Sequence, residues 1–231
     1  MGPTPSVTRR NDRARRPSEP DLGEPPAEAD AFPRNLAGAE LEDARYSNED
    51  RPGRDAAGLT AFGCRFDAID LSETSVRRAR LRDSLIQGGS LANADATEAS
   101  FARTELRGVR ATGVTLTRAK LVDVTFAECR LDFSSLRSAS LERARFEGCR
   151  MEDADLSGVS ALDVVFEWCD LTRTSLAEAR FERCEMIGCS LDGVGNPERL
   201  RDVGIPWDDV VRSAATLAAG IGVRILEDGA V

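Results

Sequence analysis

Apolar residues recur at every fifth position over more than half of the chain. The series starts at Phe66 and ends at Leu191, and each of its 26 positions is apolar. A second series lies two residues earlier, from Cys64 to Cys189, and its members are small in nearly every case and never charged. A period of five is neither the helical 3.6 nor the strand period of 2. It indicates a repeat solenoid, whose units bury their apolar side chains only by stacking.

Strand geometry explains how five residues can form one side of such a solenoid. Side chains alternate along an extended chain, so both apolar series point inward and the residue between them points outward, while the remaining two residues turn a corner. We call the five positions inner small, outward, inner large, first corner and second corner. Arg, Asp, Glu, Ser and Thr concentrate at the outward and corner positions. The sequence therefore predicts a tube with an apolar interior and a charged surface.

A spacing of twenty residues predicts four sides per coil. Cysteines at positions 129, 149, 169 and 189 repeat at this distance, as do phenylalanines at 126, 146 and 166. Three sides would instead align every third repeat, which these rows do not follow. With about 4.8 Å between neighbouring coils, the repeats form a rod on the order of 30 Å long.

The repeats resemble those of the pentapeptide-repeat proteins, whose pattern is A(D/N)LxX. The pattern is visible at 119–121 (Ala-Lys-Leu), 154–156 (Ala-Asp-Leu) and 179–181 (Ala-Arg-Phe), and the resemblance covers residues 64–191 without a gap. It implies an all-β solenoid, the right-handed quadrilateral β-helix of that family. It implies much less about function, because one fold hosts many roles.

Residues 1–33 have a different composition from the repeats. They contain seven of the ten prolines and almost no large apolar residue, which predicts a disordered tail that is basic at its start and acidic afterwards. No apolar segment follows the first arginines, and no run reaches membrane-spanning length. We therefore expect no membrane association and a cytoplasmic location.

The solenoid is expected over residues 34–195, with an irregular or looped segment at 47–62. Glu49 and Arg54 occupy inner small positions, and Pro52 follows Glu49 closely. Two interpretations stay open. In one, a partial coil is followed by a loop at 49–58 that leaves the tube, and in the other the whole N-terminal region is an irregular cap.

Residues 196–231 are predicted to form a small α-helical cap, because a solenoid end exposes unpaired backbone and open core. Asn196-Pro197 is a start signal for a short helix, and a second helix is expected over about 206–219. In the quinolone-resistance branch of the family, a similar C-terminal helix caps the rod and mediates a symmetric dimer. The resemblance thus implies a homodimer, with Trp207, Val211 and Leu217 as apolar contributors.

All six cysteines occupy inner small positions: Cys64, Cys129, Cys149, Cys169, Cys184 and Cys189. A buried free cysteine behaves as a small hydrophobic residue. A straight column of parallel side chains does not converge on a tetrahedral metal ion, and its geometry does not suit disulfides. We expect structural thiols, no metal site and a reducing compartment.

Nothing in the sequence indicates catalysis. The chain has no histidine, and the nucleotide-binding, hydrolase and metalloprotease motifs are missing. The acidic residues are scattered over outward and corner positions, as solvated surface residues usually are. The sequence predicts a protein that is not an enzyme, with no catalytic residue and no cofactor.

Charge differs between the two halves of the rod. Residues 64–120 carry a net charge of +3 and residues 121–195 a net charge of −7. An acidic surface repels nucleic acid, so no direct nucleic-acid binding is expected, and it attracts a basic groove of a protein partner. The alternative is a solubilising surface diluted by arginine. The candidate partner residues are Asp132, Glu147, Glu152, Asp153 and Glu167.

Apolar residues interrupt this surface at Leu162, Val165 and Trp168. Trp168 stands between Gly148 and Gly188 in the twenty-residue spacing, so its ring is expected to lie over bare backbone. The three residues form either a local packing cluster or an anchor for a partner, since Trp is enriched at interface hot spots.

Two functions are compatible with these features. One is a general scaffold that holds a protein partner through the coil faces, the early loop or Trp168. The other is a DNA mimic, because members of the quinolone-resistance branch bind a type II topoisomerase with an acidic rod in place of duplex DNA. A basic cluster at residues 77–82 departs from a continuous acidic rod. A protein-interaction role therefore ranks first, with DNA gyrase as its most specific partner.

Overall fold

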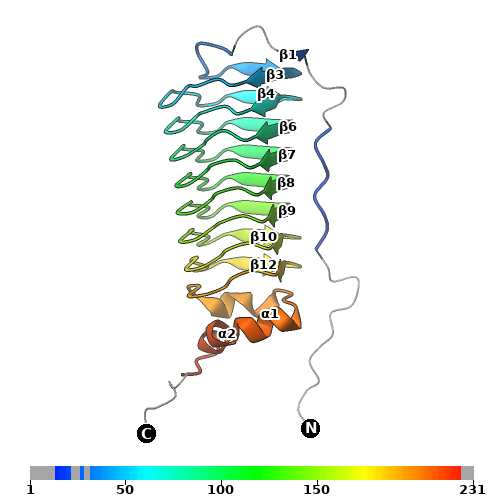
Figure 1. Ribbon diagram of the computed structural model, residues 1–231, viewed down its shortest axis with the longest axis vertical. Helices are drawn as coiled ribbons and strands as arrows, with labels where there is room; N and C mark the ends of the chain where they lie inside the picture. Colours follow the sequence, from blue (N-terminus) through cyan, green and yellow to red (C-terminus); the bar gives the residue numbers. More distant parts are fainter. Residues whose placement is uncertain (1–13, 22–26, 29–31, 225–231) are drawn as a thin grey trace.

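The protein is a rod of parallel strands stacked along one axis, with short helices at its C-terminal end (Figure 1). The computed structural model describes residues 14–21, 27–28 and 32–224. The strands join in one parallel sheet that winds around the rod. This architecture confirms the predicted all-β solenoid with a small helical cap.

The four faces are numbered along the chain: face 1 is pentad 64–68 and its equivalents every twenty residues, face 2 is 69–73, face 3 is 74–78 and face 4 is 79–83. Strands occupy faces 4 and 1. The strands of face 4 are β2 (Glu40–Glu42), β4 (Thr60–Phe62), β10 (Ser160–Leu162) and β12 (Arg180–Glu182). Those of face 1 are β1 (Ala27–Glu28), β3 (Ala44–Ser47), β5 (Arg65–Asp67), β11 (Val165–Glu167) and β13 (Glu185–Ile187). Four longer strands continue from face 4 into face 1: β6 (Arg80–Gln87), β7 (Ser100–Arg107), β8 (Lys120–Ala127) and β9 (Ser140–Glu147).

The register confirms four repeats per coil. Leu81 pairs with Phe101, and Phe101 pairs with Leu121, so residues twenty apart lie on neighbouring rungs. Faces 2 and 3 repeat this register through single bridges such as Arg110 with Arg130. Each coil therefore stacks on the next with every pentad position in its own column.

The inner large positions fill the bore. Phe126, Phe146 and Phe166 form a stack on face 1, with ring centroids 4.9 Å apart in both pairs and interplanar angles of 2° and 8°. All three side chains are fully buried. Burying such a side chain stabilises the fold by about 1.5–3 kcal/mol, and this gain is available only when coils stack.

The second corner of each pentad adopts the left-handed backbone conformation. Asp83 and Arg103 have φ values of 49° and 46°, while Gly88 and Gly188 have 64° and 66°. A non-glycine residue in this conformation costs roughly 1–2 kcal/mol. The square coil therefore requires backbone strain at each corner that is occupied by a residue other than glycine.

At residues 47–62 the structure differs from the sequence prediction. β2 and β4 pair in register across this segment, and the amide of Arg51 donates to the carbonyl of Asp70 at 2.8 Å. Glu49 and Arg51 form an ion pair at 2.9 Å. The segment is thus a regular coil rather than a loop or an irregular cap. Its backbone hydrogen bonds set its course, and Glu49 pairs with Arg51, which occupies the neighbouring inner large position.

The C-terminal cap is more broken than the sequence predicts. A 3-10 helix, η2 (Pro197–Asp202), is followed by α1 (Trp207–Arg212) and α2 (Ala214–Gly220), so the helix expected at 206–219 is interrupted at Ser213. None of the helices in the described residues is long and apolar enough to cross a bilayer.

Side chains of the cap satisfy backbone groups of the last coil. The Asp209 carboxylate accepts a hydrogen bond from the amide of Gly188 at 2.6 Å, and the Thr216 hydroxyl donates to the carbonyl of Leu191 at 3.1 Å. Leu200 is buried over the end of the bore. The cap thereby closes both the open core and the unpaired strand edge.

Residues 14–21, which the sequence places in a disordered tail, run along the outside of the rod (Figure 1). Phe32, at the end of the predicted tail, is buried against Tyr46, with ring centroids 5.0 Å apart. Residues 1–13, 22–26 and 29–31 of the tail lie outside the described residues.

Candidate interaction surface

The cysteines line the bore as free, buried thiols. The Cys149 thiol donates to the carbonyl of Phe126 at 3.3 Å, and the Thr174 hydroxyl donates to that of Met151 at 2.9 Å in the same relation, 23 residues back. Burial raises the pKa of the Cys184 thiol to about 11. Within the described residues, no group of three or more His, Cys, Asp or Glu side chains converges as metal ligands would.

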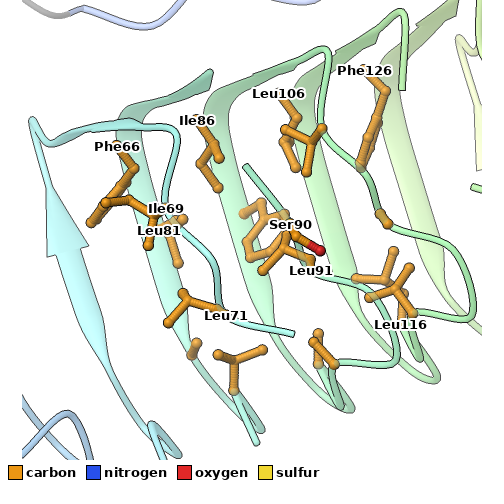
Figure 2. A pocket seen from close by; sticks show the side chains of 18 of the residues that line it. Phe66, Ile69, Leu71, Leu81, Ile86, Ser90, Leu91, Leu106, Leu116 and Phe126 are labelled. Carbon is orange, nitrogen blue, oxygen red and sulfur yellow. The ribbon is translucent and has the colours of Figure 1, made fainter. Parts of the chain in front are cut away.

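The N-terminal part of the bore contains an apolar cavity of about 60 Å³ (Figure 2). Ala96 and Ala111 line it at inner large positions, where the next coil carries Leu116 and Leu131. The bore is therefore not fully packed at these positions. The cavity is internal and apolar apart from Ser90, so it offers no polar groups arranged for chemistry.

Arginines neutralise the candidate acidic residues on face 2. Arg173 holds Asp153 through two hydrogen bonds of 2.9 and 2.7 Å, contacts Glu152 at 2.5 Å and lowers the pKa of Asp153. Asp132 is 8% exposed and lies 3.7 Å from Arg150. These three carboxylates therefore belong to ion pairs rather than to an open acidic patch.

The candidates on face 1 are paired in the same way. Arg145 lies between Glu147 and Glu167 and forms ion pairs with both, the first at 3.2 Å. Pairing was predictable in outline, because the twenty-residue register sets these columns side by side. A count of charges along the chain does not reveal this pairing, because the partners lie on neighbouring coils.

Other acidic residues of the C-terminal half form no ion pair with the described arginines and lysine. Three of them lie on faces 1 and 2 or at the corner between these faces: Glu128, Asp170 and Glu185. A fourth, Asp192, lies at the next corner, between faces 2 and 3. The sequence analysis did not single them out as a group. Glu128, Asp170 and Glu185 place unpaired negative charge at one edge of the rod.

Trp168 stands at that same edge. It is 65% exposed at a second corner with a φ of 55°, and a Cβ added at Gly188 would approach its ring to 2.2 Å. The indole therefore lies over the bare backbone of Gly188, as expected, though not over Gly148. The predicted apolar cluster does not form an exposed patch: Val165 is buried between Arg145 and Glu185 of neighbouring rungs, whose long stems flank it.

The predicted dimer residues lie in the cap with different exposure. Trp207 and Val211 are 76% and 57% exposed, whereas Leu217 packs against the core. Ile221 and Val223, which the sequence analysis did not name, are also exposed. The end of the rod thus presents several apolar side chains to solvent.

Comparison with known proteins agrees with this geometry. The family model described as pentapeptide repeats matches eight copies at residues 79–118, 119–158 and 163–194. No curated protein matches the chain. Its fold is similar to that of a trypsin-treated form of QnrB1, a plasmid-mediated fluoroquinolone resistance protein, at 21% identity and a TM-score of 0.42, covering 87% of this chain and 98% of that one.

A second similar structure is HetL, a pentapeptide repeat protein involved in heterocyst differentiation regulation from the cyanobacterium Nostoc sp. strain PCC 7120. The identity is 16% and the TM-score 0.39, over 74% of this chain and 89% of that one. At these values the structural likeness concerns the fold only. The repeat model and the four-sided coil lead to one assignment: the chain belongs to the pentapeptide-repeat proteins.

Proposed function

We propose that this rod is a non-catalytic protein-binding module whose contact surface is the corner between faces 1 and 2 in its C-terminal half. The observation that carries this proposal is Trp168, a large aromatic side chain exposed on a rigid corner. Tryptophan is enriched among residues that dominate binding energy, and a side chain held against backbone loses little entropy when a partner covers it.

The charge around Trp168 indicates the chemistry of the partner. Glu128, Asp170 and Glu185 flank this corner without arginine partners in the described chain. A partner with an apolar pocket rimmed by basic side chains is complementary to such a surface. Binding should weaken with salt, because exposed charges are screened over about 10 Å at 0.1 M ionic strength.

DNA gyrase is the most specific partner that we propose. The family resemblance and the net charge of −7 over residues 121–195 support it. The ion pairs of Asp132, Glu152 and Asp153 weigh against a rod that imitates DNA along its whole length. A gyrase-binding surface would therefore be restricted to the unpaired edge, and a dimer through Trp207 and Val211 would present two such edges.

A supercoiling assay with purified gyrase, with and without a quinolone, tests the gyrase form of the proposal. We expect the protein to change supercoiling or protect the enzyme, and the Trp168→Ala variant to lose this effect. Phe133→Ala is the matched control, since Phe133 is a second-corner aromatic with 63% exposure on another edge. No effect at micromolar protein, together with no retention of gyrase on immobilised protein, would remove gyrase as the partner.

The broader scaffold role has its own test. Proteins retained from a cell extract by the wild type and the Phe133→Ala variant should be lost with Trp168→Ala. Retention that is equal for all three would place the contact surface elsewhere on the rod.

A further inference from the structure

Aspartate and arginine alternate along the corner between faces 4 and 1. This column consists of six second-corner residues, each one coil from the next: Asp83, Arg103, Asp123, Arg143, Asp163 and Arg183. We call it the Asp/Arg column. Each of its members has the left-handed backbone conformation, so the side chains leave equivalent points of successive coils.

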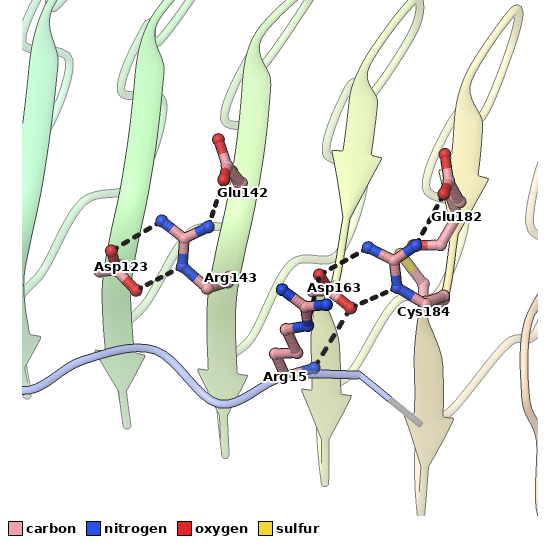
Figure 3. Close-up of polar contacts among 8 residues, drawn as sticks. Arg15, Asp123, Glu142, Arg143, Asp163, Glu182 and Cys184 are labelled. Atoms are coloured by element: carbon pink, nitrogen blue, oxygen red, sulfur yellow. Dashed lines mark hydrogen bonds and ion pairs between the residues drawn. The ribbon is translucent and has the colours of Figure 1, made fainter. Parts of the chain in front are cut away.

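The column is divided into three bidentate ion pairs. Arg143 donates to Asp123 at 2.8 and 2.9 Å, and Arg183 donates to Asp163 through Nε and Nη2, each at 2.8 Å (Figure 3). Arg103 holds Asp83 in the same way. The guanidinium groups lower the pKa of all three aspartates, which are therefore charged acceptors at neutral pH.

Residues 14–21, which we call the strap, bond to every aspartate of the column. The backbone amides of Arg15, Ser18 and Asp21 donate to the Oδ1 atoms of Asp163, Asp123 and Asp83, at 3.3, 3.0 and 3.4 Å. The strap runs opposite to the order of the coils, because Arg15 meets Asp163 and Asp21 meets Asp83. Figure 3 shows the contact at Arg15. Every third amide of the strap therefore bonds to an aspartate, and successive aspartates are two coils apart.

This matching follows from two repeat distances. Three residues of a polyproline II helix advance about 9.3 Å, and two coils of a β-solenoid advance about 9.6 Å. The strap has the corresponding three-residue pattern: Ala14, Pro17 and Pro20 are half-buried and the residues between them are exposed. Proline has no amide hydrogen, and in this phase it never occupies a donor position.

We propose that the Asp/Arg column is a binding site for polyproline II peptides and that residues 14–21 occupy it in cis. The ligand class is an extended segment with a free amide at every third residue and an alanine or proline directly before it. Nothing in the rod's repeat pattern requires the aspartates to remain buried; the strap covers them, leaving Asp83, Asp123 and Asp163 at most 8% exposed.

The column recognises backbone amides of the strap, and charge adds one long ion pair of 4.0 Å between Arg15 and Asp163. Each aspartate already has an arginine partner, so an added peptide needs no net charge, and the strap indeed contains Arg15, Arg16, Glu19 and Asp21. The strap covers the edge between faces 4 and 1 and leaves Trp168 exposed. The inference is thus independent of the proposed partner of the rod, and either can fail without the other.

Amide hydrogen exchange, measured by NMR on the full chain, tests the strap directly. We expect the amides of Arg15, Ser18 and Asp21 to exchange roughly tenfold or more slowly than those of Arg16 and Glu19. Equal exchange of all five amides at the rates of an unstructured peptide would overturn the proposal.

Two insertions test the register without touching the rod. One serine inserted between Ser18 and Glu19 moves Pro20, which has no amide hydrogen, into the donor position opposite Asp83. The control repeats Ser-Glu-Pro after Pro20 and keeps the period of three. We expect the single insertion to abolish protection at the Asp83 end, and the control to retain it at the added serine. Equal protection in both variants would contradict the polyproline II register.

Binding in trans tests the site itself. A fluorescent peptide with the sequence of residues 14–21 should bind the single-serine variant at least about fivefold more tightly than the wild type, whose own strap competes at an effective concentration in the millimolar range. The absence of binding to the variant at millimolar peptide would overturn the assignment of the column as a peptide site.

Discussion

The two halves of the rod share one backbone and differ in what fills and covers it. In the N-terminal half, Ala96 and Ala111 leave an apolar cavity, and the surface charge is positive. In the C-terminal half, stacked phenylalanines and a column of cysteines fill the bore, and the surface is acidic. Hydrogen bonding between coils therefore tolerates variation of the inner residues. Stability and surface chemistry can therefore vary along the rod without a change of fold.

The largest expected effect comes from the phenylalanine stack. Phe146→Ala should lower the free energy of unfolding by about 3–5 kcal/mol, because a well-packed site cannot collapse around the lost ring. Phe101→Ala is the matched change beside the cavity, and we expect a smaller loss there. Urea unfolding followed by circular dichroism measures both values. Equal losses would show that the two halves are packed alike.

Buried and exposed ion pairs should differ next. Arg143→Gln leaves the buried Asp123 without its charged partner and should cost about 2 kcal/mol at neutral pH. Arg173→Gln breaks the exposed pair with Asp153 and should cost much less. Thermal unfolding of both variants at low ionic strength checks the order, and a larger loss for Arg173→Gln would contradict it.

Acid should reduce the effect of Arg143→Gln. Arg143 lowers the pKa of Asp123 in the folded state, so the stability from this pair is present above the unfolded-state value near 4 and is lost as the pH falls through the folded value. The melting temperatures of wild type and variant should therefore differ most above about pH 4 and converge below it. A constant difference down to the acid transition would mean that the ion pair does not account for the loss.

Replacing an inner alanine by leucine should change the stability moderately and with opposite sign in the two halves. Ala111→Leu adds carbon atoms to the cavity and should stabilise the protein by about 0.5–2 kcal/mol. Ala161→Leu overpacks the C-terminal bore and should destabilise it by about 1–3 kcal/mol. Calorimetry of the two variants gives the signs, and stabilisation by both would mean that the C-terminal bore also has spare volume.

The smallest effect is expected at the cysteine column. Cys149→Ser keeps a donor for the carbonyl of Phe126, as Thr174 does for Met151, so the loss should stay within about 1 kcal/mol. Cys149→Ala removes the donor and leaves the carbonyl without it. A serine variant less stable than the alanine variant would show that the thiol hydrogen bond is unimportant there.

Much of the fold could be predicted because the period of five maps directly onto inward, outward and corner positions. The twenty-residue columns of Phe126 and Cys129 predicted four sides, and the register confirms them. The prediction of a loop at residues 49–58 was wrong because it rested on the charged side chains at inner positions. The backbone hydrogen bonds that hold this segment in a regular coil cannot be read from the sequence. The interruption of the C-terminal helix at Ser213 was not predicted, because no proline or glycine lies at this local turn.

The candidate surface was less predictable, because exposure and pairing depend on neighbouring coils. Trp168 was identified as an anomaly, and its contact with Gly188 followed from the register. The burial of Val165 depends on the side chains flanking it on neighbouring rungs. The alternation of Asp83 and Arg103 along one corner was readable in the sequence once every twentieth residue is aligned. The binding of residues 14–21 to that corner was not, because the three-residue pattern of Ala14, Pro17 and Pro20 is short and does not stand out among the other prolines of the tail.

The affinity of purified DNA gyrase for the wild type, Trp168→Ala and Phe133→Ala proteins tests the central claim most directly. The account predicts that Trp168→Ala weakens binding roughly tenfold or more while Phe133→Ala changes it little, and that added salt weakens the wild-type complex. Equal affinities of the two variants would contradict the claim that the corner at Trp168 is the contact surface.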